Sequence, residues 1–276
     1  MRHLRWIVWC MVAVAAAGVA AGVTRASGSS AKPQSYYLAL GDSIAYGVQP
    51  TRAKPTPSAS HTGYVDVFAA RLRKLSPDLE VVNYGCPGES TATFTRGGCP
   101  AIADRIKLHD AFSGSQMKAA LGFLRAHPGD VSPITLTLYG NDWLPLLLDT
   151  CKTDVACVRK RGPSAIASFG SRLKSIVQRL RTAAPTAEII VTGAWNPDPE
   201  HLAQLRPIYR SLEASIARAA AAPSHARVAE MLPVFNPPRN GGARLCAFTF
   251  ICSKGDPHPT DAGYRAMADA VMRASG

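Results

Sequence analysis

Two residues far apart in the chain have the side chains that nucleophilic catalysis needs. Ser43 ends the tripeptide Gly-Asp-Ser directly after a compact apolar run, and His258 stands between two prolines. A serine hydroxyl becomes an effective nucleophile when an adjacent base takes its proton. A turn restricted by proline would hold an imidazole still for that purpose. The sequence therefore predicts Ser43 as a nucleophile and His258 as its general base.

Acyl transfer also needs hydrogen-bond donors for the charge that develops on the carbonyl oxygen. Three candidates follow three apolar runs: the main-chain amides of Ser43 and Gly85 and the side-chain amide of Asn141. If the runs are parallel strands, their carboxyl ends border one crevice, and we expect the three groups to form an oxyanion hole there. Taken singly, Gly85 is explained as well by a turn, and Asn141 by capping of its own loop.

The base itself needs an acceptor that holds its second ring nitrogen as a donor. Two acceptors lie close in sequence, the carboxylate of Asp256 and the main-chain carbonyl of Gly255. Pro257 favours extended backbone at the residue before it, which could turn the Asp256 side chain away from the ring. We predict a triad of Ser43, His258 and Asp256, with the Gly255 carbonyl as the alternative partner.

Apolar runs that end at or near glycine alternate with helix-like segments along the chain. The runs are Tyr36–Leu40, Glu80–Tyr84, Ile134–Tyr139 and Glu188–Thr192, with a fifth near Arg227–Met231. The expected helices are Tyr64–Leu75, Gln116–Ala126, Ser164–Ala183, Leu202–Ala221 and one that begins at Thr260. Such alternation predicts an α/β fold with a central parallel sheet of about five strands, covered by helices on both faces.

The 276 residues are enough for one α/β domain, and 47% of them are hydrophobic. Arg2 and Arg5 precede an uncharged run that ends in small residues, which is typical of a secretory signal peptide, here residues 1–26. An uncleaved membrane anchor is the alternative. Residues 27–35 are rich in Ser, Gly, Lys and Pro and are predicted to be a linker to a single domain over residues 36–276.

The formal net charge of the chain is +12, and removal of residues 1–26, with three arginines and no acidic residue, leaves +9. This charge favours peripheral contact with an anionic membrane or cell-wall surface. The basic residues are scattered, and no nucleic-acid-binding motif accompanies them, so we expect no nucleic-acid partner.

Beyond Cys10, which lies in the leader, six cysteines form three close pairs in the sequence. An even number behind a secretion signal indicates disulfide bonds, and short loops are the least costly to close. The predicted pairs are Cys86–Cys99, Cys151–Cys157 and Cys246–Cys252. No CxxC or HExxH spacing supports zinc as the alternative.

The candidate residues lie in four blocks that resemble, in order, those of the SGNH or GDSL hydrolase family, named after a serine, a glycine, an asparagine and a histidine. The matching stretches are Ala39-Leu40-Gly41-Asp42-Ser43, Asn83-Tyr84-Gly85, Gly140-Asn141-Asp142 and His258-Pro259-Thr260-Asp261-Ala262-Gly263-Tyr264. The resemblance spans most of residues 36–276. It implies a flavodoxin-like, three-layer α/β/α SGNH hydrolase fold and ester hydrolysis that needs no metal or cofactor.

Two positions depart from the family pattern. Tyr139 stands two residues before the asparagine, where the family usually has glycine, and Gly255 stands three before the histidine, where it usually has aspartate. The aspartate of this chain, Asp256, is two residues before the histidine. The local path at Tyr139 and the partner of the histidine are therefore the points that a structure must decide.

The sequence thus predicts a secreted, monomeric serine hydrolase that cleaves small-molecule or lipid esters through an acyl-enzyme, as an esterase or lipase. The apolar stretch Trp143–Leu148 either lines an acyl pocket or packs in the core. Within the enzyme class, the alternative is a carbohydrate O-acetyl esterase that acts on a polysaccharide. Outside it, the alternative is a catalytically inactive secreted binding protein that has kept the fold.

Overall fold

A computed structural model describes residues 34–50, 62–221 and 223–276, all of which lie in one unit of the chain, residues 33–276. The predicted signal peptide, residues 1–26, and most of the predicted linker, residues 27–35, lie outside the described residues. The leader, the linker and the domain limits therefore stay predictions.

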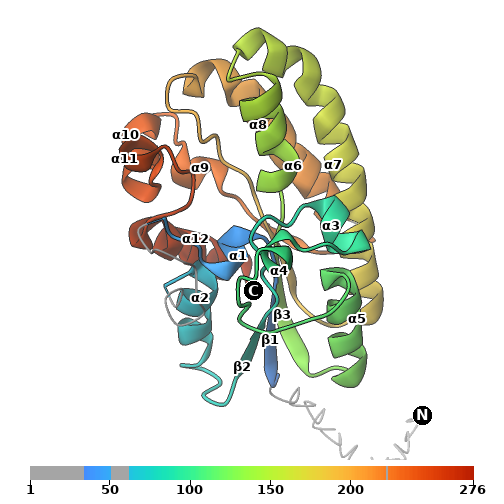
Figure 1. The fold of residues 1–276 in the computed structure, drawn as a ribbon. Helices are drawn as coiled ribbons and strands as arrows, with labels where there is room; N and C mark the ends of the chain where they lie inside the picture. Colours follow the sequence, from blue (N-terminus) through green and yellow to red (C-terminus); the bar gives the residue numbers. More distant parts are fainter. Residues whose placement is uncertain (1–33, 51–61, 222) are drawn as a thin grey trace, which may run out of the picture. The chain divides into compact units, whose positions relative to one another are not determined.

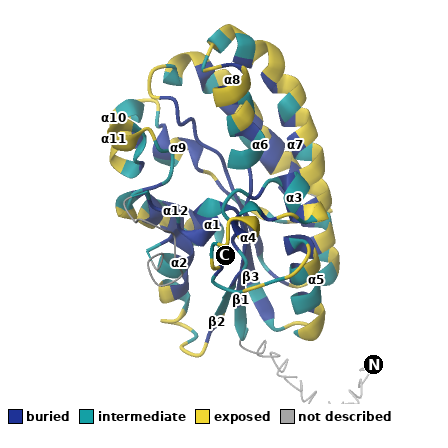
Figure 2. Cartoon of the chain, in the orientation of Figure 1, coloured by how far each residue is buried: buried dark blue, intermediate teal, exposed yellow. Residues whose placement is uncertain are grey.

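The centre of the fold is a sheet of five parallel strands in the order β2-β1-β3-β4-β5. The strands are β1 (Tyr36–Gly41), β2 (Glu80–Asn83), β3 (Val131–Thr137), β4 (Ile189–Thr192) and β5 (Arg227–Ala229). Nearly every residue of the three central strands is buried, as Figure 2 shows, because helices cover both faces of the sheet. The predicted α/β fold with a central parallel sheet is confirmed.

Long helices form the two outer layers (Figure 1). On one face, α2 (Tyr64–Leu72) packs against α12 (Asp261–Ala274). On the other are α5 (Gln116–Ala126), α7 (Val155–Ala183) and α8 (Leu202–Ala220), with α7 in contact with both neighbours. The chain moves outward from β1 to β2 and then returns past β1 to β3, so right-handed crossovers place these helices on opposite faces. None of the helices in the described part of the chain is both long enough and apolar enough to cross a membrane.

Short helical segments of four to eight residues were not predicted, because one or two turns show too little periodicity to be recognised in the sequence. They are α1 (Ser43–Tyr46), α3 (Thr91–Arg96), α4 (Pro100–Ala103), α6 (Gly140–Leu144), the π-helical segment η2 (Pro145–Thr150), α9 (Leu232–Phe235), α10 (Gly241–Phe248) and α11 (Ile251–Lys254).

Some boundaries differ from the predicted ones. α7 begins at Val155 rather than Ser164, because the side chain of Asp154 accepts a hydrogen bond from the Cys157 amide (2.6 Å) and caps an earlier start. The helix then continues through Pro163, a residue of low helix propensity that hides this first part in the sequence. The strand predicted over Ile134–Tyr139 is shifted to Val131–Thr137.

The three predicted disulfide bonds, Cys86–Cys99, Cys151–Cys157 and Cys246–Cys252, are all present. Each closes a short stretch of chain, and none joins two strands of the sheet. The nearest-neighbour pairing inferred from loop length is therefore confirmed.

The turn that leaves β1 requires glycine. Gly41 has a φ of +137°, and a Cβ on this residue would lie 2.2 Å from the carbonyl oxygen of Thr137. We expect Gly41→Ala to lower the free energy of unfolding by at least about 2 kcal/mol, since it combines backbone strain with overlap against a neighbouring strand. Urea unfolding monitored by circular dichroism measures the change.

Gly122→Ala is the matched control. Gly122 lies inside α5, and a Cβ there meets no atom within 4 Å. This variant should be as stable as the wild type or more stable by about 0.5–1 kcal/mol, because alanine favours a helix. Equal stabilities of the two variants would contradict the role given to Gly41.

Candidate active site

Ser43 is placed by the junction of β1 with α1. The main-chain amide of Asp42 donates to the carbonyl oxygen of Thr137 (3.1 Å), so the chain is still attached to β3 one residue before the serine. The Asp42 side chain then accepts a hydrogen bond from the Ile44 amide (2.9 Å) and caps α1. Ser43 is the first residue of that helix, at the carboxyl edge of the sheet.

The structure brings the three predicted triad residues into one hydrogen-bonded chain. His258 Nε2 lies 2.8 Å from Ser43 Oγ, and His258 Nδ1 lies 2.7 Å from Asp256 Oδ1. With a proton on Nδ1 that is donated to the carboxylate, Nε2 is free to accept the serine proton. This geometry is the one that activation of a serine requires.

The partner of the imidazole is the Asp256 carboxylate rather than the Gly255 carbonyl. Gly255 ends α11 with a φ of +66°, a conformation that favours glycine, and its amide donates to Ile251 (2.9 Å). Asp256 Oδ1 accepts from both the main-chain amide (2.8 Å) and Nδ1 of His258. The intervening Pro257 therefore does not turn the carboxylate away from the ring. Gly255 ends α11 where the family usually has its aspartate, and the acid of this chain stands one residue later, at Asp256.

The environment of Asp256 keeps its carboxyl ionised. Burial alone would raise its pKa, but the hydrogen bonds and charge of His258, with the charge of Lys254, outweigh burial and hold the pKa below its ordinary value. An ionised partner can stabilise the imidazolium that forms when His258 takes a proton.

Of the three predicted oxyanion donors, two have a hydrogen available to donate. The main-chain amide of Ser43 has no acceptor among the described residues. The side-chain amide of Asn141 donates one hydrogen to the carbonyl oxygen of Glu89 (2.9 Å), which leaves its second hydrogen for another acceptor.

The third predicted donor, the Gly85 amide, is already engaged with Asn83 Oδ1 (2.8 Å). An oxyanion contact from Gly85 requires that this hydrogen bond be shared or broken. Close packing also explains why glycine occupies this position, because a Cβ on residue 85 would lie 2.6 Å from the amide nitrogen of Tyr46 in α1.

Tyr139, the other departure from the family pattern, has a φ of −165° and a ψ of −34°. Its φ is not positive, so the residue does not occupy the left-handed region that favours glycine. The side chain is buried, with its ring centroid 5.4 Å from that of Trp195. The next residues begin α6, whose first turn contains Asn141.

Comparison with known proteins identifies the family of the chain. Residues 39–266 match the GDSL-like Lipase/Acylhydrolase family. The chain belongs to this family. No curated protein matches it significantly in sequence. Among solved structures, this GDSL-like chain resembles phospholipase A1 from Streptomyces albidoflavus NA297, at 18% identity and a TM-score of 0.60 over 88% of this chain and 100% of that one.

Two further solved structures show the same fold. The extracellular lipase from Streptomyces rimosus is 18% identical, with a TM-score of 0.59 over 87% of this chain and 100% of that one. The acetylxylan esterase Axe2 from Geobacillus stearothermophilus is 17% identical, with a TM-score of 0.55 over 89% of this chain and 96% of that one. At these identities the likeness establishes the fold, and substrate must be argued from this chain's own residues.

Several residues that shape this GDSL-like site were not predicted from the sequence. Gln116, fully buried at the start of α5, accepts from the Gly41 amide (2.6 Å) and donates to the Gly41 carbonyl (3.0 Å) and to Glu89 Oε2 (3.0 Å). It ties the segment before Ser43 to Glu89, whose carbonyl oxygen accepts from the Asn141 side chain. Asp142, the residue after Asn141, accepts a hydrogen bond from Thr91. Its place in the Gly-Asn-Asp block was the one sign of this residue in the sequence.

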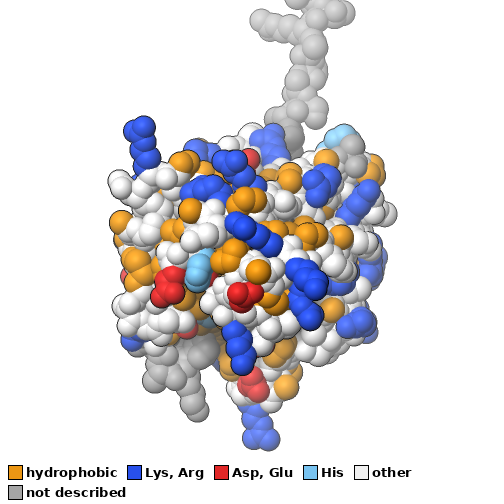
Figure 3. Space-filling view, turned by 90° about the horizontal axis from the view of Figure 1, so that it is seen from above, with side chains coloured by type: hydrophobic (Ala, Val, Ile, Leu, Met, Phe, Trp, Pro, Cys, Tyr) orange, Lys and Arg blue, Asp and Glu red, His pale blue; other side chains and the backbone are white. Residues whose placement is uncertain are grey.

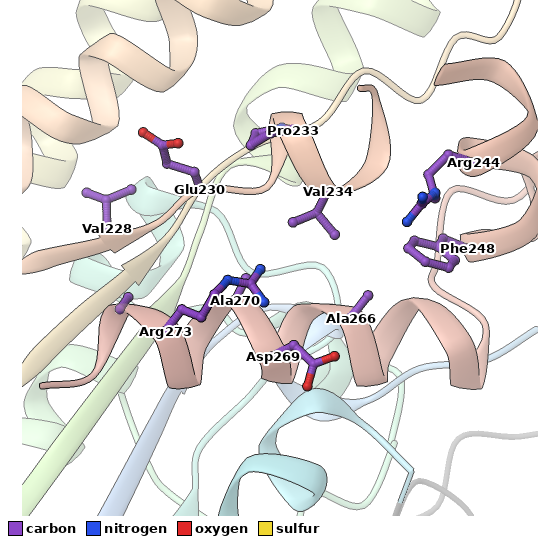
Figure 4. A pocket seen from close by; sticks show the side chains of 11 residues that line it. Val228, Glu230, Pro233, Val234, Arg244, Phe248, Ala266, Asp269, Ala270 and Arg273 are labelled. Atoms are coloured by element: carbon purple, nitrogen blue, oxygen red, sulfur yellow. The ribbon is translucent and has the colours of Figure 1, made fainter. Parts of the chain in front are cut away.

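Two cavities are relevant to ligand binding. One, of about 280 Å³, is lined by Leu144, Leu147 and Leu148 from the segment after Asn141 and by Gly255 and Pro257, which flank Asp256. A larger one, of about 570 Å³, lies between α12 and the segment around Pro233 (Figure 4) and contains none of the candidate catalytic residues. Ser43, His258, Asp256 and Asn141 do not line the smaller cavity either, but two of its lining residues, Gly255 and Pro257, flank Asp256 in the chain.

The segment Trp143–Leu148 both packs in the core and lines a cavity. Trp143 and Leu147 are buried, and Trp143 Nε1 donates to the hydroxyl of Tyr209 (2.8 Å). Leu147 also contributes to the smaller cavity, together with Leu144 and the half-exposed Leu148.

One group of potential metal ligands occurs in the described residues. A sulfur of Cys86, a sulfur of Cys99 and a carboxylate oxygen of Glu89 lie within 4.8 Å of one another. The two sulfurs are bonded to each other, so they offer no thiolate to a metal.

Asp256→Asn tests the third member of the triad. The amide cannot accept the Nδ1 proton and stabilise the imidazolium in the same way, and loss of such an acid in another serine hydrolase costs about ten-thousandfold in turnover. We expect a loss of at least about a hundredfold, measured as kcat on a p-nitrophenyl ester. Asp269→Asn, which changes an exposed acid of α12, is the control. Activity within about tenfold of the wild type would remove Asp256 from the triad.

Asp42→Asn tests the buried carboxyl next to Ser43. Burial, only partly offset by the Ile44 hydrogen bond and the charge of His258, raises the pKa of Asp42 from 3.8 to about 7. Folding therefore favours the protonated carboxyl, and the associated stability is present below pH 3.8 and lost as the pH rises toward about 7. Relative to the wild type, the variant should gain stability across this interval, by at most about 4 kcal/mol.

Urea unfolding at a series of pH values measures this gain. Asp78→Asn, which removes an exposed acid, is the control and should show no comparable trend. A constant difference between the Asp42→Asn variant and the wild type over the same interval would show that Asp42 does not titrate there.

Proposed function

We propose that this protein is a secreted serine hydrolase of the esterase or lipase type, which cleaves carboxylic esters through an acyl-enzyme. The observation that carries the proposal is the hydrogen-bonded chain from Ser43 through His258 to Asp256, with distances of 2.8 and 2.7 Å. Membership of the GDSL-like lipase/acylhydrolase family supports the same reaction class.

The first half of the reaction forms the acyl-enzyme. Ser43 Oγ attacks the ester carbon while its proton passes to His258 Nε2, and the ionised Asp256 stabilises the imidazolium. The negative oxygen of the tetrahedral intermediate accepts hydrogen bonds from the Ser43 amide and from the free hydrogen of Asn141. The intermediate then collapses, the bond to the leaving oxygen breaks, and His258 returns its proton to the departing alcohol.

The second half repeats these steps with water. His258 takes a proton from a water molecule, whose oxygen attacks the acyl carbon, and the same donors stabilise the second tetrahedral intermediate. Collapse releases the carboxylic acid and restores the hydroxyl of Ser43. The chain's own residues supply every proton transfer in this scheme.

The smaller cavity supports an acyl chain as the group recognised beside the triad. Its leucines and Ile251 provide an apolar wall, and its volume of about 280 Å³ is near the lower end of typical ligand pockets, about 300 Å³. We infer that it accepts short and medium acyl chains and that a fatty chain as long as palmitoyl exceeds it.

The acidic residues that line the cavity support a second candidate, an O-acetyl esterase that acts on a polysaccharide. Asp198 and Glu200 form this acidic wall, and Asp198 Oδ2 is held by His201 Nδ1 at 2.8 Å. Carboxylates are good acceptors for sugar hydroxyls. In this alternative the acetyl group occupies the site at Ser43, and the sugar contacts the acidic wall.

Secretion is supported by three disulfide bonds, which persist in oxidising compartments. We further propose a monomer that makes peripheral contact with an anionic membrane or cell-wall surface. Figure 3 shows lysine and arginine side chains spread over one face of the molecule and interleaved with hydrophobic ones, a pattern that suits such a contact.

The function is tested with a series of p-nitrophenyl esters, from acetyl through butyryl and octanoyl to palmitoyl, together with acetylated xylooligosaccharides. We expect the highest kcat/KM on butyryl or octanoyl esters and none in the Ser43→Ala variant. A preference for the acetylated sugars would select the second candidate. A folded wild type that hydrolyses no ester and is not labelled by a fluorophosphonate would favour the inactive binding protein.

Ile251→Trp tests the cavity directly. The larger side chain should fill the cavity and lower kcat/KM for the octanoyl ester by about tenfold or more, because the loss of one methylene contact lowers kcat/KM by about tenfold or more. The kcat/KM for the acetyl ester should stay within about twofold of the wild-type value. Ile102→Trp, in a separate surface cavity, is the matched control. A parallel loss on both esters would show that the cavity does not hold the acyl chain.

A further inference from the structure

A closed hydrogen-bond network lies beside the candidate oxyanion donor. Asp142 Oδ2 accepts from the main-chain amide of Thr91 (2.8 Å), and Asp142 Oδ1 accepts from the Thr91 hydroxyl (2.6 Å). Thr91 is fully buried, and the Asp142 side chain is 4% exposed. The two residues thereby join the first turn of α3 to the first turn of α6.

Arg172, from the middle of α7, completes this network. Its Nε donates to the Thr91 hydroxyl (2.7 Å), and its Nη2 donates to Asp142 Oδ1 (3.0 Å). The planar guanidinium fits two acceptors at once, which an ammonium group does not. α3 packs against α7, so a helix of the outer layer is connected to the edge of the site (Figure 1).

The network brackets Asn141 from both sides. Asp142 is the next residue along the chain, and Glu89, whose carbonyl oxygen accepts from the Asn141 side chain, lies two residues before Thr91. The bonds between Thr91 and Asp142 therefore fix the Glu89 carbonyl oxygen relative to the backbone of Asn141. The direction of the remaining amide hydrogen depends on that relation.

We propose that Thr91 and Arg172 are positioning residues that hold Asn141 in the orientation needed to stabilise the oxyanion. This inference rests on the proposed function. It differs from a purely structural role, because small errors of placement at a reacting centre cost more in rate than in stability. A plain surface ion pair contributes little to either quantity.

The test compares close substitutions. Thr91→Val keeps the shape and removes the hydroxyl, and Thr91→Ser keeps the hydroxyl. We expect Thr91→Val and Arg172→Ala to lower kcat on p-nitrophenyl butyrate by about tenfold with KM within about twofold, and Thr91→Ser to restore most of kcat. Arg71→Ala, which removes an arginine paired with Asp269 elsewhere on the surface, is the control and should leave kcat unchanged.

A double-substitution cycle identifies the residue through which the network acts. In an Asn141→Ala background, Arg172→Ala should lower the remaining kcat by less than about twofold, because the group that it positions is absent. Thermal unfolding of each variant accompanies the kinetics. Three outcomes would overturn the proposal. The losses in kcat could multiply in the double variant, Thr91→Ser could be as slow as Thr91→Val, or kcat could follow only the folded fraction of each variant.

The outcomes also separate this inference from the function on which it rests. If the wild type hydrolyses the ester but Thr91→Val is as fast, only the positioning role fails. If the wild type neither hydrolyses the ester nor reacts with a fluorophosphonate, the proposed function and the positioning role both fail.

Discussion

The parallel pairing of β1 with β3 determines where the groups of the site lie relative to one another. β1 leads directly to Ser43, and β3 leads within a few residues to Asn141. The last pair in the register is Gly41 with Thr137, and the next amide, of Asp42, still bonds Thr137. One register therefore sets the positions of both Ser43 and Asn141, and a slip by one residue would turn every side chain of β1 to the other face of the sheet. The close approach at Gly41 leaves little room for such a slip.

The parts of this arrangement that are encoded locally could be predicted from the sequence. Buried parallel strands are recognisable as continuous apolar runs, so the sheet and the crevice at its carboxyl edge followed from the pattern. Ser43, Asn141 and His258 each occupy a short block next to a predicted element, and the structure gathers all three at this edge. The partner of His258 could be narrowed only to Asp256 or Gly255, because the choice depends on where α11 ends. That helix is a single turn, and its left-handed end at Gly255 is visible only in the structure.

The remaining parts depend on contacts between segments distant in the chain. Gln116 begins α5 and bonds Gly41, and Arg172 lies in the middle of α7 and bonds Thr91. In the sequence each is one polar residue in an amphipathic helix, where most such residues face solvent. Gly85 shows the opposite difficulty: its block matches the family, but its amide is taken by Asn83 within the same turn. Predicting these bonds requires the packing of the helices on the sheet as well as their existence.

The positions of the three disulfide bonds have a consequence for how the molecule would open. Cys86–Cys99 begins next to Gly85, Cys151–Cys157 connects η2 to α7 beside the smaller cavity, and Cys246–Cys252 connects α10 to α11 shortly before Asp256. Each bond thus restrains one wall of the crevice and leaves the strand ladder to its own hydrogen bonds. Proteins open in local units whose free energies differ, and the least stable units open first. Reduction would therefore lower the opening free energy of the crevice walls before that of the sheet, and amide hydrogen exchange would quicken in these three loops while β1, β3 and β4 stay protected.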